Sequence, residues 1–358
     1  MNTQILIVGG GLSGLTLASQ LQDAGVDWQL LEARDRWGGR ILTEVIEGQG
    51  FDLGPSWFWP AQPRLEALIT KHGLSRFDQA YKGDLMYQDE NGVVERGQGF
   101  APMQGSWRLK GGLGKLIEKL VSALPADRLH LNTPVSKIKD GSVDAKSAIA
   151  VSTESDTTYI ASKVVLAIPP RIASELNYQP ALSAEVIQAA QNTPTWMAGH
   201  AKVVAIYTTP FWKESGLSGD VMSRRGPLTE IHDASPFEAG PHALFGFVGT
   251  PASHRCENVD ELKNAITKQL GLLFGELGAN PKVLLLKDWA FDLYTATKLD
   301  QISVHSHPAY SRPDALKALW HDRLHFGSTE MGSQFGGFLE GAVEVADELA
   351  AILTKLSK

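Results

Sequence analysis

Three glycines and a glutamate near the start of the chain have the types and spacing of a dinucleotide-binding turn. Gly9, Gly11 and Gly14 follow the apolar run 5–8 in the pattern G-x-G-x-x-G, and Glu32 comes 18 residues after Gly14. The first glycine permits a tight turn, the second lets a pyrophosphate approach the backbone, and the third lets a helix pack closely on a strand. The acid accepts hydrogen bonds from ribose hydroxyls. These four residues predict a dinucleotide site.

The elements around these residues supply the context that the fingerprint requires. Apolar residues recur at helical spacing over 12–21, Gly25 suits the end of a helix, and a second apolar run, 28–31, leads into the acid. The free N–H groups at the start of the helix, at Leu12 and Ser13, would face the phosphates. A glycine-rich turn without a ligand is the alternative. The full order of strand, turn, helix, strand and acid favours the dinucleotide.

A second glycine pair follows in the string EARDRWGGR, residues 32–40. This string resembles the second signature of the flavin-containing amine oxidase family, in which E-A-R-x-x-x-G-G-R binds FAD. By this resemblance the glycine pair comes close to the FAD diphosphate and the arginine faces the cofactor. A surface cation is the alternative for that arginine. The resemblance implies cofactor-binding roles for Ala33, Arg34, Gly38, Gly39 and Arg40.

Later stretches resemble the same family, in the same order. Lys202 is followed by the string PFW at 210–212, and the string FGSTE at 326–330 is followed by GGFLEGA at 336–342. The resemblance runs from Gly9 to Ala342. It implies an α/β fold with a Rossmann-like FAD-binding domain of the GR2 type and an inserted α+β substrate domain. The further cofactor-binding residues that it implies are Gly54, Pro55, Ser56, Val135 (for adenine), Glu330, Gly337, Phe338 and Leu339.

The order of these signatures predicts how the chain divides into domains. We expect the FAD-binding domain to comprise 1–75, 106–170 and 290–358, and the substrate domain to comprise 76–105 and 171–289. Residues 77–105 are polar and irregular apart from a hairpin-like Asn91-Gly92 turn. The last helix, with charges at helical intervals, is expected to lie on the surface.

Lys202 is the strongest single candidate for chemistry. It is the only charge in the eight-residue apolar run 200–207. A buried ammonium is costly unless it has partners, so the position predicts a function. In the family that it resembles, the matching lysine binds a water next to flavin N5. The alternative is a strand-end lysine that reaches solvent.

Aromatic residues are candidates for a wall beside the flavin or the substrate. In a strand, Trp57 and Trp59 would share one face, with Phe58 on the other; core packing is the alternative. By resemblance, Phe338 takes the place of one of two tyrosines that hold the substrate amine. The second falls near Leu299, or at Tyr294 with a small gap, so the cage is incomplete. The arginine with which amino-acid oxidases bind a carboxylate has no counterpart after the Asp52-Leu53-Gly54 turn.

Composition excludes several classes of partner. The net charge is −7, from 33 basic and 40 acidic residues, and no basic run interrupts it. Nucleic acid and anionic membranes are therefore not expected as partners. No apolar run approaches about 18 residues, so we expect no membrane span. The chain begins almost directly on the nucleotide strand, which leaves no room for a signal peptide and favours the cytoplasm.

Cysteine and histidine usage gives further expectations. Cys256 is the only cysteine, so neither an intramolecular disulfide nor a cysteine metal site is possible, and we expect a buried thiol. Family members that attach FAD covalently use a cysteine where this chain has Lys298, so non-covalent FAD is expected. The pair His305 and His307 has no third ligand close in sequence, and no metal is expected.

These observations predict an FAD-dependent oxidoreductase of the amine-oxidase type. Hydride would pass from a small-molecule substrate, possibly an amine, to flavin N5, with O2 as the expected acceptor. The catalytic candidates are Lys202, Phe338 and Trp57. One alternative is a C–C desaturase or other flavin dehydrogenase for a hydrophobic substrate. Another is an FAD-binding protein without amine turnover.

Overall fold

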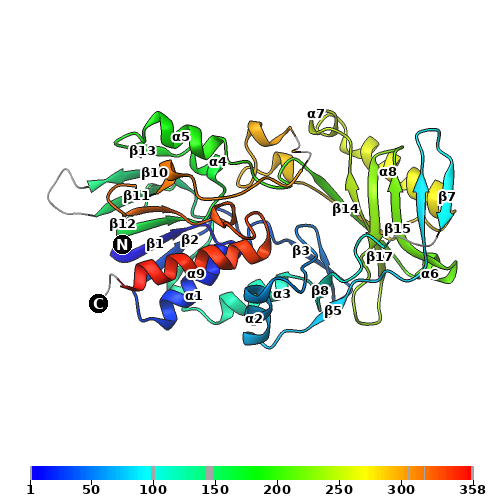
Figure 1. Ribbon diagram of the computed structural model, residues 1–358, viewed down its shortest axis with the longest axis horizontal. Helices are drawn as coiled ribbons and strands as arrows, with labels where there is room; N and C mark the ends of the chain where they lie inside the picture. Colours follow the sequence, from blue (N-terminus) through cyan, green and yellow to red (C-terminus); the bar gives the residue numbers. More distant parts are fainter. Residues whose placement is uncertain are drawn as a thin grey trace.

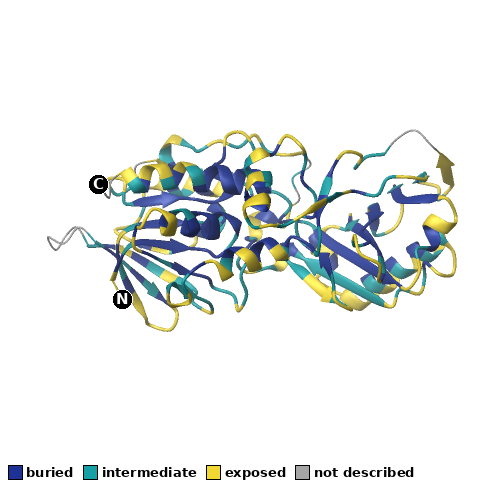
Figure 2. Cartoon of the chain, turned by 90° about the horizontal axis from the view of Figure 1, so that it is seen from below, coloured by how far each residue is buried: buried dark blue, intermediate teal, exposed yellow. Residues whose placement is uncertain are grey.

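The computed structural model describes residues 2–97, 101–141, 148–302, 304, 306–317 and 319–355. In these ranges the strands form two large sheets, one at each end of the elongated molecule in Figure 1. Figure 2 shows that buried residues gather in two regions, one around each sheet. Among the described residues no helix is long and apolar enough to cross a membrane.

The first sheet is built around β1 (Asn2–Val8), the predicted nucleotide strand. β1 pairs in parallel with β2 (Trp28–Leu31) on one side and with β12 (Thr158–Leu166) on the other. Its apolar run is buried because it lies between two strands and under helices. The described strands of this sheet run in the order β13 (Asn177–Gln179), β10 (Val135–Asp140), β11 (Ile149–Thr153), β12, β1, β2 and β9 (Leu129–His130), and β19 (Leu324–Phe326) pairs with β12.

Helices cover this sheet, and the first of them lies where the sequence predicts a helix. α1 (Leu12–Asp23) begins directly after the glycine turn and ends before Gly25, whose φ of +69° suits a helix end. It packs against α9 (Leu339–Lys355), which lies alongside it in Figure 1, and against α3 (Gly114–Ser122). The other elements near this sheet are α2 (Pro63–Lys71), α4 (Pro170–Ala173), α5 (Ala184–Gln191) and the strand pairs β3 (Thr43–Ile46) with β4 (Gln49–Asp52) and β5 (Arg76–Asp78) with β8 (Trp107–Leu109).

The expectation that the last helix lies on the surface is wrong for its first half. Glu340 and Glu344 of α9 are 0% and 3% exposed. Glu340 accepts the N–H of Leu65 at 2.8 Å, at the start of α2, and Glu344 accepts the N–H of Ser333 at 3.0 Å and that of Phe335 at 3.1 Å. These charges are therefore buried caps for neighbouring backbone rather than a solvated face.

The second sheet carries Lys202. Its described strands run in the order β18 (Val283–Asp288), β14 (Ala201–Tyr207), β17 (His242–Val248), β16 (Leu228–Asp233), β15 (Leu217–Ser223), β6 (Asp84–Gln88) and β7 (Val94–Gly97). α8 (Val259–Phe274) covers one face, and the short α6 (Phe211–Glu214) and α7 (Ala252–Arg255) lie at its ends (Figure 1).

Alternation along β14 decides which side chains face the rest of the molecule. Val203 and Ala205 pack in the cluster that contains α8. Val204 and Ile206 pack on the opposite face with Phe51 of β4. Lys202 is two residues before Val204, so its side chain lies on that second face. The second face of the sheet is turned towards the FAD-binding segments.

One expected boundary and one expectation of irregular structure differ from the structure. Residues 177–191 were expected in the substrate domain, but β13 pairs in parallel with β10 and α5 packs in the core of the first sheet. The apolar residues of 177–191 pack against the core of the first sheet. Within the expected irregular segment 77–105, residues 84–97 are more regular than expected, because β6 and β7 form a hairpin around the Asn91-Gly92 turn.

Candidate functional site

A cavity of about 1230 Å³ lies between the two sheets. Its wall is formed by the turn after β1, the loop after β4, one face of β14 and the start of α9. Every residue of the predicted site lines it except Gly14, Ala33, Val135 and Glu330. Signatures that are far apart in sequence thus come together around one space.

The three glycines of the first turn differ in what a side chain would meet. Gly9 has φ +113°, and an added Cβ would lie 2.6 Å from the Ala167 carbonyl oxygen. At Gly14 the Cβ would lie 2.0 Å from the Gly9 oxygen, so the glycine is needed for helix and strand to pack. At Gly11 the nearest protein atom would be 3.9 Å away, on Gly38. Packing therefore does not require a glycine at position 11. The close approach of a ligand diphosphate would explain why a glycine stands there.

The start of α1 is open towards the same space. Its N-cap, Gly11, provides no side-chain cap, and Leu12 and Ser13 line the cavity. The first N–H groups of a helix lack intrahelical partners and lie at its positive dipole end. An isolated bridge between Gly11 and Gly38 brings the second glycine pair beside them. These residues therefore fit a dinucleotide diphosphate.

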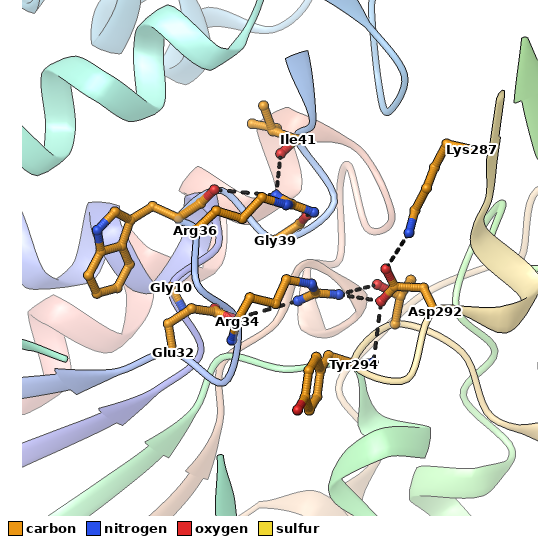
Figure 3. Close-up of polar contacts among 11 residues, drawn as sticks. Gly10, Glu32, Arg34, Arg36, Gly39, Ile41, Lys287, Asp292 and Tyr294 are labelled. Atoms are coloured by element: carbon orange, nitrogen blue, oxygen red, sulfur yellow. Dashed lines mark hydrogen bonds and ion pairs between the residues drawn. The ribbon is translucent and has the colours of Figure 1, made fainter. Parts of the chain in front are cut away.

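Glu32 lies at the end of β2 and is 3% exposed (Figure 3). Its carboxylate accepts the N–H of Gly10 at 2.7 Å and the N–H of Arg34 at 2.9 Å. These two bonds fix the orientation of the carboxylate at the cavity wall. The backbone also joins Glu32 to the segment between β9 and β10, since the N–H of Thr133 donates to its carbonyl at 2.8 Å.

Asp292 is a charged residue of the site that sequence reasoning missed. Its carboxylate contacts the Arg34 guanidinium and accepts from Lys287 Nζ at 2.6 Å (Figure 3). Burial works to raise its pKa, but the two cations hold the pKa of Asp292 below its usual range. Arg34 also lies over the Tyr294 ring, 5.2 Å from the centroid. The segment after β18 therefore fixes Arg34.

Arg36 holds the second glycine turn. Its guanidinium donates to the carbonyls of Gly39 at 2.9 Å and Ile41 at 3.2 Å, as Figure 3 shows.

Arg40 is held by Glu330, which accepts two hydrogen bonds from it at 2.5 and 3.2 Å. Burial would lower the pKa of Arg40, but the buried Glu330 carboxylate raises it above its usual range. Glu330 thus acts on the site through Arg40.

The other predicted residues outside the lining have different places. Gly14 acts in packing, as described above. Ala33 is half-buried beside Glu32, and Val135 begins β10, two residues after Thr133, whose N–H reaches Glu32. Val135 therefore lies at the same end of the site as the acid.

Lys202 is buried, with 4% exposure, and does not reach solvent. Its Nζ donates to the Gly54 carbonyl and to Ser56 Oγ, both at 2.6 Å. The rings of Phe245 and Trp57 lie 4.4 and 5.3 Å from it. Burial lowers the pKa of Lys202 to about 7, although Asp52 acts in the opposite direction. An ammonium has three donors, so one remains for a water or ligand.

The aromatic side chains divide as the alternation predicts. Trp57 and Trp59 line the cavity, whereas Phe58 is fully buried in the core of the first sheet. Trp57 is fixed by its Nε1, which donates to Gln79 Oε1 at 2.9 Å. The Trp59 ring stands perpendicular to Phe338, with centroids 6.5 Å apart. Phe338 and the two tryptophans therefore form an aromatic wall.

Of the two positions expected for the second ring of the cage, Leu299 is outside the cavity lining, whereas Tyr294 lines the cavity. Leu299 is 51% exposed, and Tyr294 lies beside Arg34. In the described part of the chain the rings beside Phe338 are Trp59 and His307, the latter stacked at 4.6 Å. His307 thus packs on Phe338. Its sequence neighbour His305 lies outside the described residues, within which no group of three or more ligand-type side chains could hold a metal ion.

Polar residues of the second sheet also line the cavity, and sequence reasoning missed them. Glu230 lies in the wall, and its carboxylate contacts His232, which contacts Asp220. The alternating polar string TEIHD at 229–233 was the available signal. His200 lines the cavity with its Nδ1 unpartnered. Cys256, expected to be buried, is exposed because α7 ends at the surface.

Comparison with known proteins places this geometry in a family. A family model described as flavin containing amine oxidoreductase matches residues 12–99 and 81–353. The chain belongs to this family. It is 22% identical to a probable flavin-containing monoamine oxidase A of Dictyostelium discoideum, over 95% of both chains. It is 23% identical to the putrescine oxidase of Kocuria rosea, over 88% of this chain and 89% of that protein.

Solved structures agree on the fold. A putrescine oxidase superposes with a TM-score of 0.83 at 22% identity, over the whole of both chains. Cyclohexylamine oxidase from Brevibacterium oxydans gives 0.83 at 19% identity, also over both chains in full. The predicted α/β fold, with a Rossmann-like FAD-binding part and a substrate part, is confirmed. Family membership likewise confirms FAD as the cofactor and makes this chain an amine-oxidase-type oxidoreductase.

Proposed function

We propose that this chain oxidises small amines at a non-covalently held FAD, with O2 as the acceptor. The observation that carries the proposal is the position of Lys202. Its buried amine joins the Gly54–Ser56 loop of the cofactor side to the aromatic wall of the substrate side. Burial of an amine is costly even with partners, so its presence at that junction favours a role in the chemistry.

The chain offers a set of residues that would hold FAD. Leu12 and Ser13 would bind the diphosphate through backbone N–H groups, and Glu32 would accept from the ribose. Val135 would contact adenine. The start of α9, at Leu339, places a helix N-terminus at the cavity, where it favours negative charge on the flavin. Lys298, at the attachment position, lines the cavity in place of a cysteine.

FAD held by these residues would supply the acceptor for a hydride from the carbon next to the amine nitrogen, which would leave an iminium ion, and O2 would then take two electrons and two protons to give hydrogen peroxide. The chain supplies position and a dry wall. Trp57, Trp59 and Phe338 exclude water from one side of the cavity. Lys202 would hold a single water through its remaining donor, next to the reacting carbon.

The charges of the wall favour amines over amino acids. Arg255 lies in the wall, but Asp288 accepts from its Nε and Nη2 at 2.7 and 2.8 Å, and the Thr250 and Gly199 carbonyls accept from Nη1 and Nη2, so that four of its five N–H donors are used. Its guanidinium is therefore committed to the loop that it anchors. A substrate carboxylate would find no free guanidinium on the substrate side of the described wall.

The division of the chain is part of the proposal. We place the substrate domain at 79–105 and about 192–289, because 177–191 packs on the first sheet.

Membership of the family supports small amines as the substrates. A cytoplasmic location stays a prediction from the sequence.

The test compares matched substrates. The holoenzyme is mixed without oxygen with an amine and with the α-amino acid that carries the same side chain. We expect the amine to bleach the flavin and the amino acid to leave it oxidised. Bleaching by the amino acid alone would contradict the proposal.

A further inference from the structure

Three side chains stand in a row across the face of the second sheet that borders the cavity. Phe247 of β17 lies opposite Lys202 of β14 on one side and opposite Glu230 of β16 on the other. Residues directly opposite in neighbouring strands point to the same face. The wall therefore presents an amine, a phenyl ring and a carboxylate in succession. Lys202 and Glu230 are two strand spacings apart, about 10 Å.

Glu230 is held by two further residues of that sheet. Its Oε1 contacts His232 Nε2 at 2.6 Å, and His232 Nδ1 contacts Asp220 Oδ1 at 2.7 Å. His232 and Asp220 have side chains 0% and 1% exposed, whereas the Glu230 side chain is 34% exposed at the cavity. The chain of bonds thus runs from the interior of the sheet to the cavity wall. It leaves the second carboxylate oxygen, Oε2, open to a ligand.

The cluster of Asp220, His232 and Glu230 carries a net negative charge whether His232 is neutral or protonated. Burial would lower the pKa of His232, but its bonds to Asp220 and Glu230 raise it. With a protonated imidazole between two carboxylates, the net charge of the three groups is −1. Asp220 and Glu230 are both partners of a buried imidazolium, and together they leave one uncompensated negative charge in a cluster that reaches the cavity wall.

The groups that face Glu230 from neighbouring strands do not neutralise it. Phe247 lies beside it on β17, and Met222 of β15 is opposite it on the other side. The nearest cation of the row, Lys202, is engaged by Gly54 and Ser56. A cationic ligand is therefore the complement that this part of the wall lacks.

We propose that Glu230, positioned by His232 and Asp220, binds a second positively charged nitrogen of the substrate, so that diamines are preferred over monoamines. One nitrogen lies at the Lys202 end, where oxidation takes place, and the other at Glu230. The methylenes between them pass over the Phe247 ring. This assignment rests on the proposed function, because it takes an amine to be the substrate.

Binding is measured apart from turnover. The holoenzyme is first reduced chemically without oxygen, so that it cannot oxidise an amine, and is titrated calorimetrically with hexylamine or hexamethylenediamine. These two probes differ only in the second nitrogen. A charge-assisted bond at Glu230 should make the diamine bind roughly 10- to 100-fold more tightly. Equal affinities would overturn the proposal.

Variants locate the effect. Glu230→Gln keeps the shape of the side chain and removes its charge, so it should abolish the diamine preference and leave hexylamine affinity unchanged. Glu95→Gln, on the exposed strand β7 of the same sheet, is the matched control and should keep the preference. A preference that persists in Glu230→Gln would overturn the assignment.

His232→Gln tests the positioning role. We expect it to weaken diamine binding and to spare hexylamine binding. An equal loss for both amines would mean that His232 only supports the fold and would overturn its part of the proposal.

Failure of the proposed function gives a different result. If no amine bleaches the oxidised flavin, amine oxidation is wrong, whereas the calorimetric preference still reports on Glu230. If hexylamine and hexamethylenediamine bleach it but bind equally, amine oxidation stands and the Glu230 site does not.

Discussion

Lys202 on β14 and Gly54 in the loop after β4 are joined by a hydrogen bond of 2.6 Å from Nζ to the carbonyl oxygen. This bond links the sheet of the substrate side to the loop of the cofactor side. The same Nζ also donates to Ser56, and both acceptors line the cavity. Lys202 is therefore fixed from two directions, and a water that it holds would also be fixed.

Replacement of Lys202 by methionine tests this arrangement. Lys202→Met keeps the length and the apolar packing and removes the donor. We expect folding and yellow colour to persist, while flavin reduction or reoxidation by O2 slows at least tenfold, about 1.4 kcal/mol of barrier. Stopped-flow measurement of both half-reactions, at equal flavin content, checks it. Unchanged rates in both would remove Lys202 from the mechanism.

The pH dependence of the site should report Lys202. Burial lowers its pKa to about 7, so the side chain is charged below that pH and neutral above it. The charged form donates a hydrogen bond to a water and stabilises the negative charge that develops on O2 as it is reduced. The neutral form is less effective in both roles. Reoxidation should therefore slow as the pH rises through about 7. The measurement is the reoxidation rate across this range, and a profile that is the same in Lys202→Met would contradict the assignment.

The glycine turn predicts opposite effects for two similar substitutions. Gly11→Ala adds a Cβ with no protein atom within 3.9 Å, so the free energy of unfolding without FAD should stay unchanged while FAD affinity falls at least tenfold. Gly14→Ala places a Cβ 2.0 Å from the Gly9 oxygen and should destabilise the fold by about 1–3 kcal/mol. Denaturation and FAD titration of both apoproteins separate the two effects. Destabilisation by Gly11→Ala would show that packing, not the ligand, requires that glycine.

Glu32→Ala should weaken FAD binding. The carboxylate holds two buried N–H groups and is expected to accept from the ribose, so its loss should cost roughly 1.5–3 kcal/mol of binding free energy. Glu44→Ala, an exposed acid on β3, serves as the control. FAD titration of the apoproteins measures the difference, and equal affinity in the two variants would exclude a role for Glu32.

FAD should be released by acid. Lys298 stands at the attachment position, and the single cysteine is elsewhere, at the end of α7. Precipitation with acid should therefore leave the yellow colour in the supernatant. A yellow pellet would show a covalent bond.

The sequence was sufficient for the elements whose pattern is local. The run 28–31 and the helix after Gly11 lie where periodicity predicts them. The face occupied by Trp57 and Trp59 also followed from alternation. The order of the family signatures also gave the predicted cofactor-binding residues, most of which line the cavity.

Features that depend on distant partners could not be predicted in this way. Glu340 and Glu344 have the spacing of a solvated helix face and are buried, because their backbone partners lie in other segments. Asp292 and Glu230 enter the site only through the packing of the second sheet. The segment 177–191 forms β13 and α5, and its local sequence does not say which sheet it joins.

Anaerobic reduction of the bound flavin tests the central claim most directly. The purified yellow holoenzyme is mixed without oxygen with a panel of alkyl and aryl amines and, separately, with polyenes. The account predicts that at least one amine bleaches the flavin, that polyenes do not, and that admission of O2 restores the colour with release of hydrogen peroxide. Bleaching by polyenes while every amine leaves the flavin oxidised would contradict it.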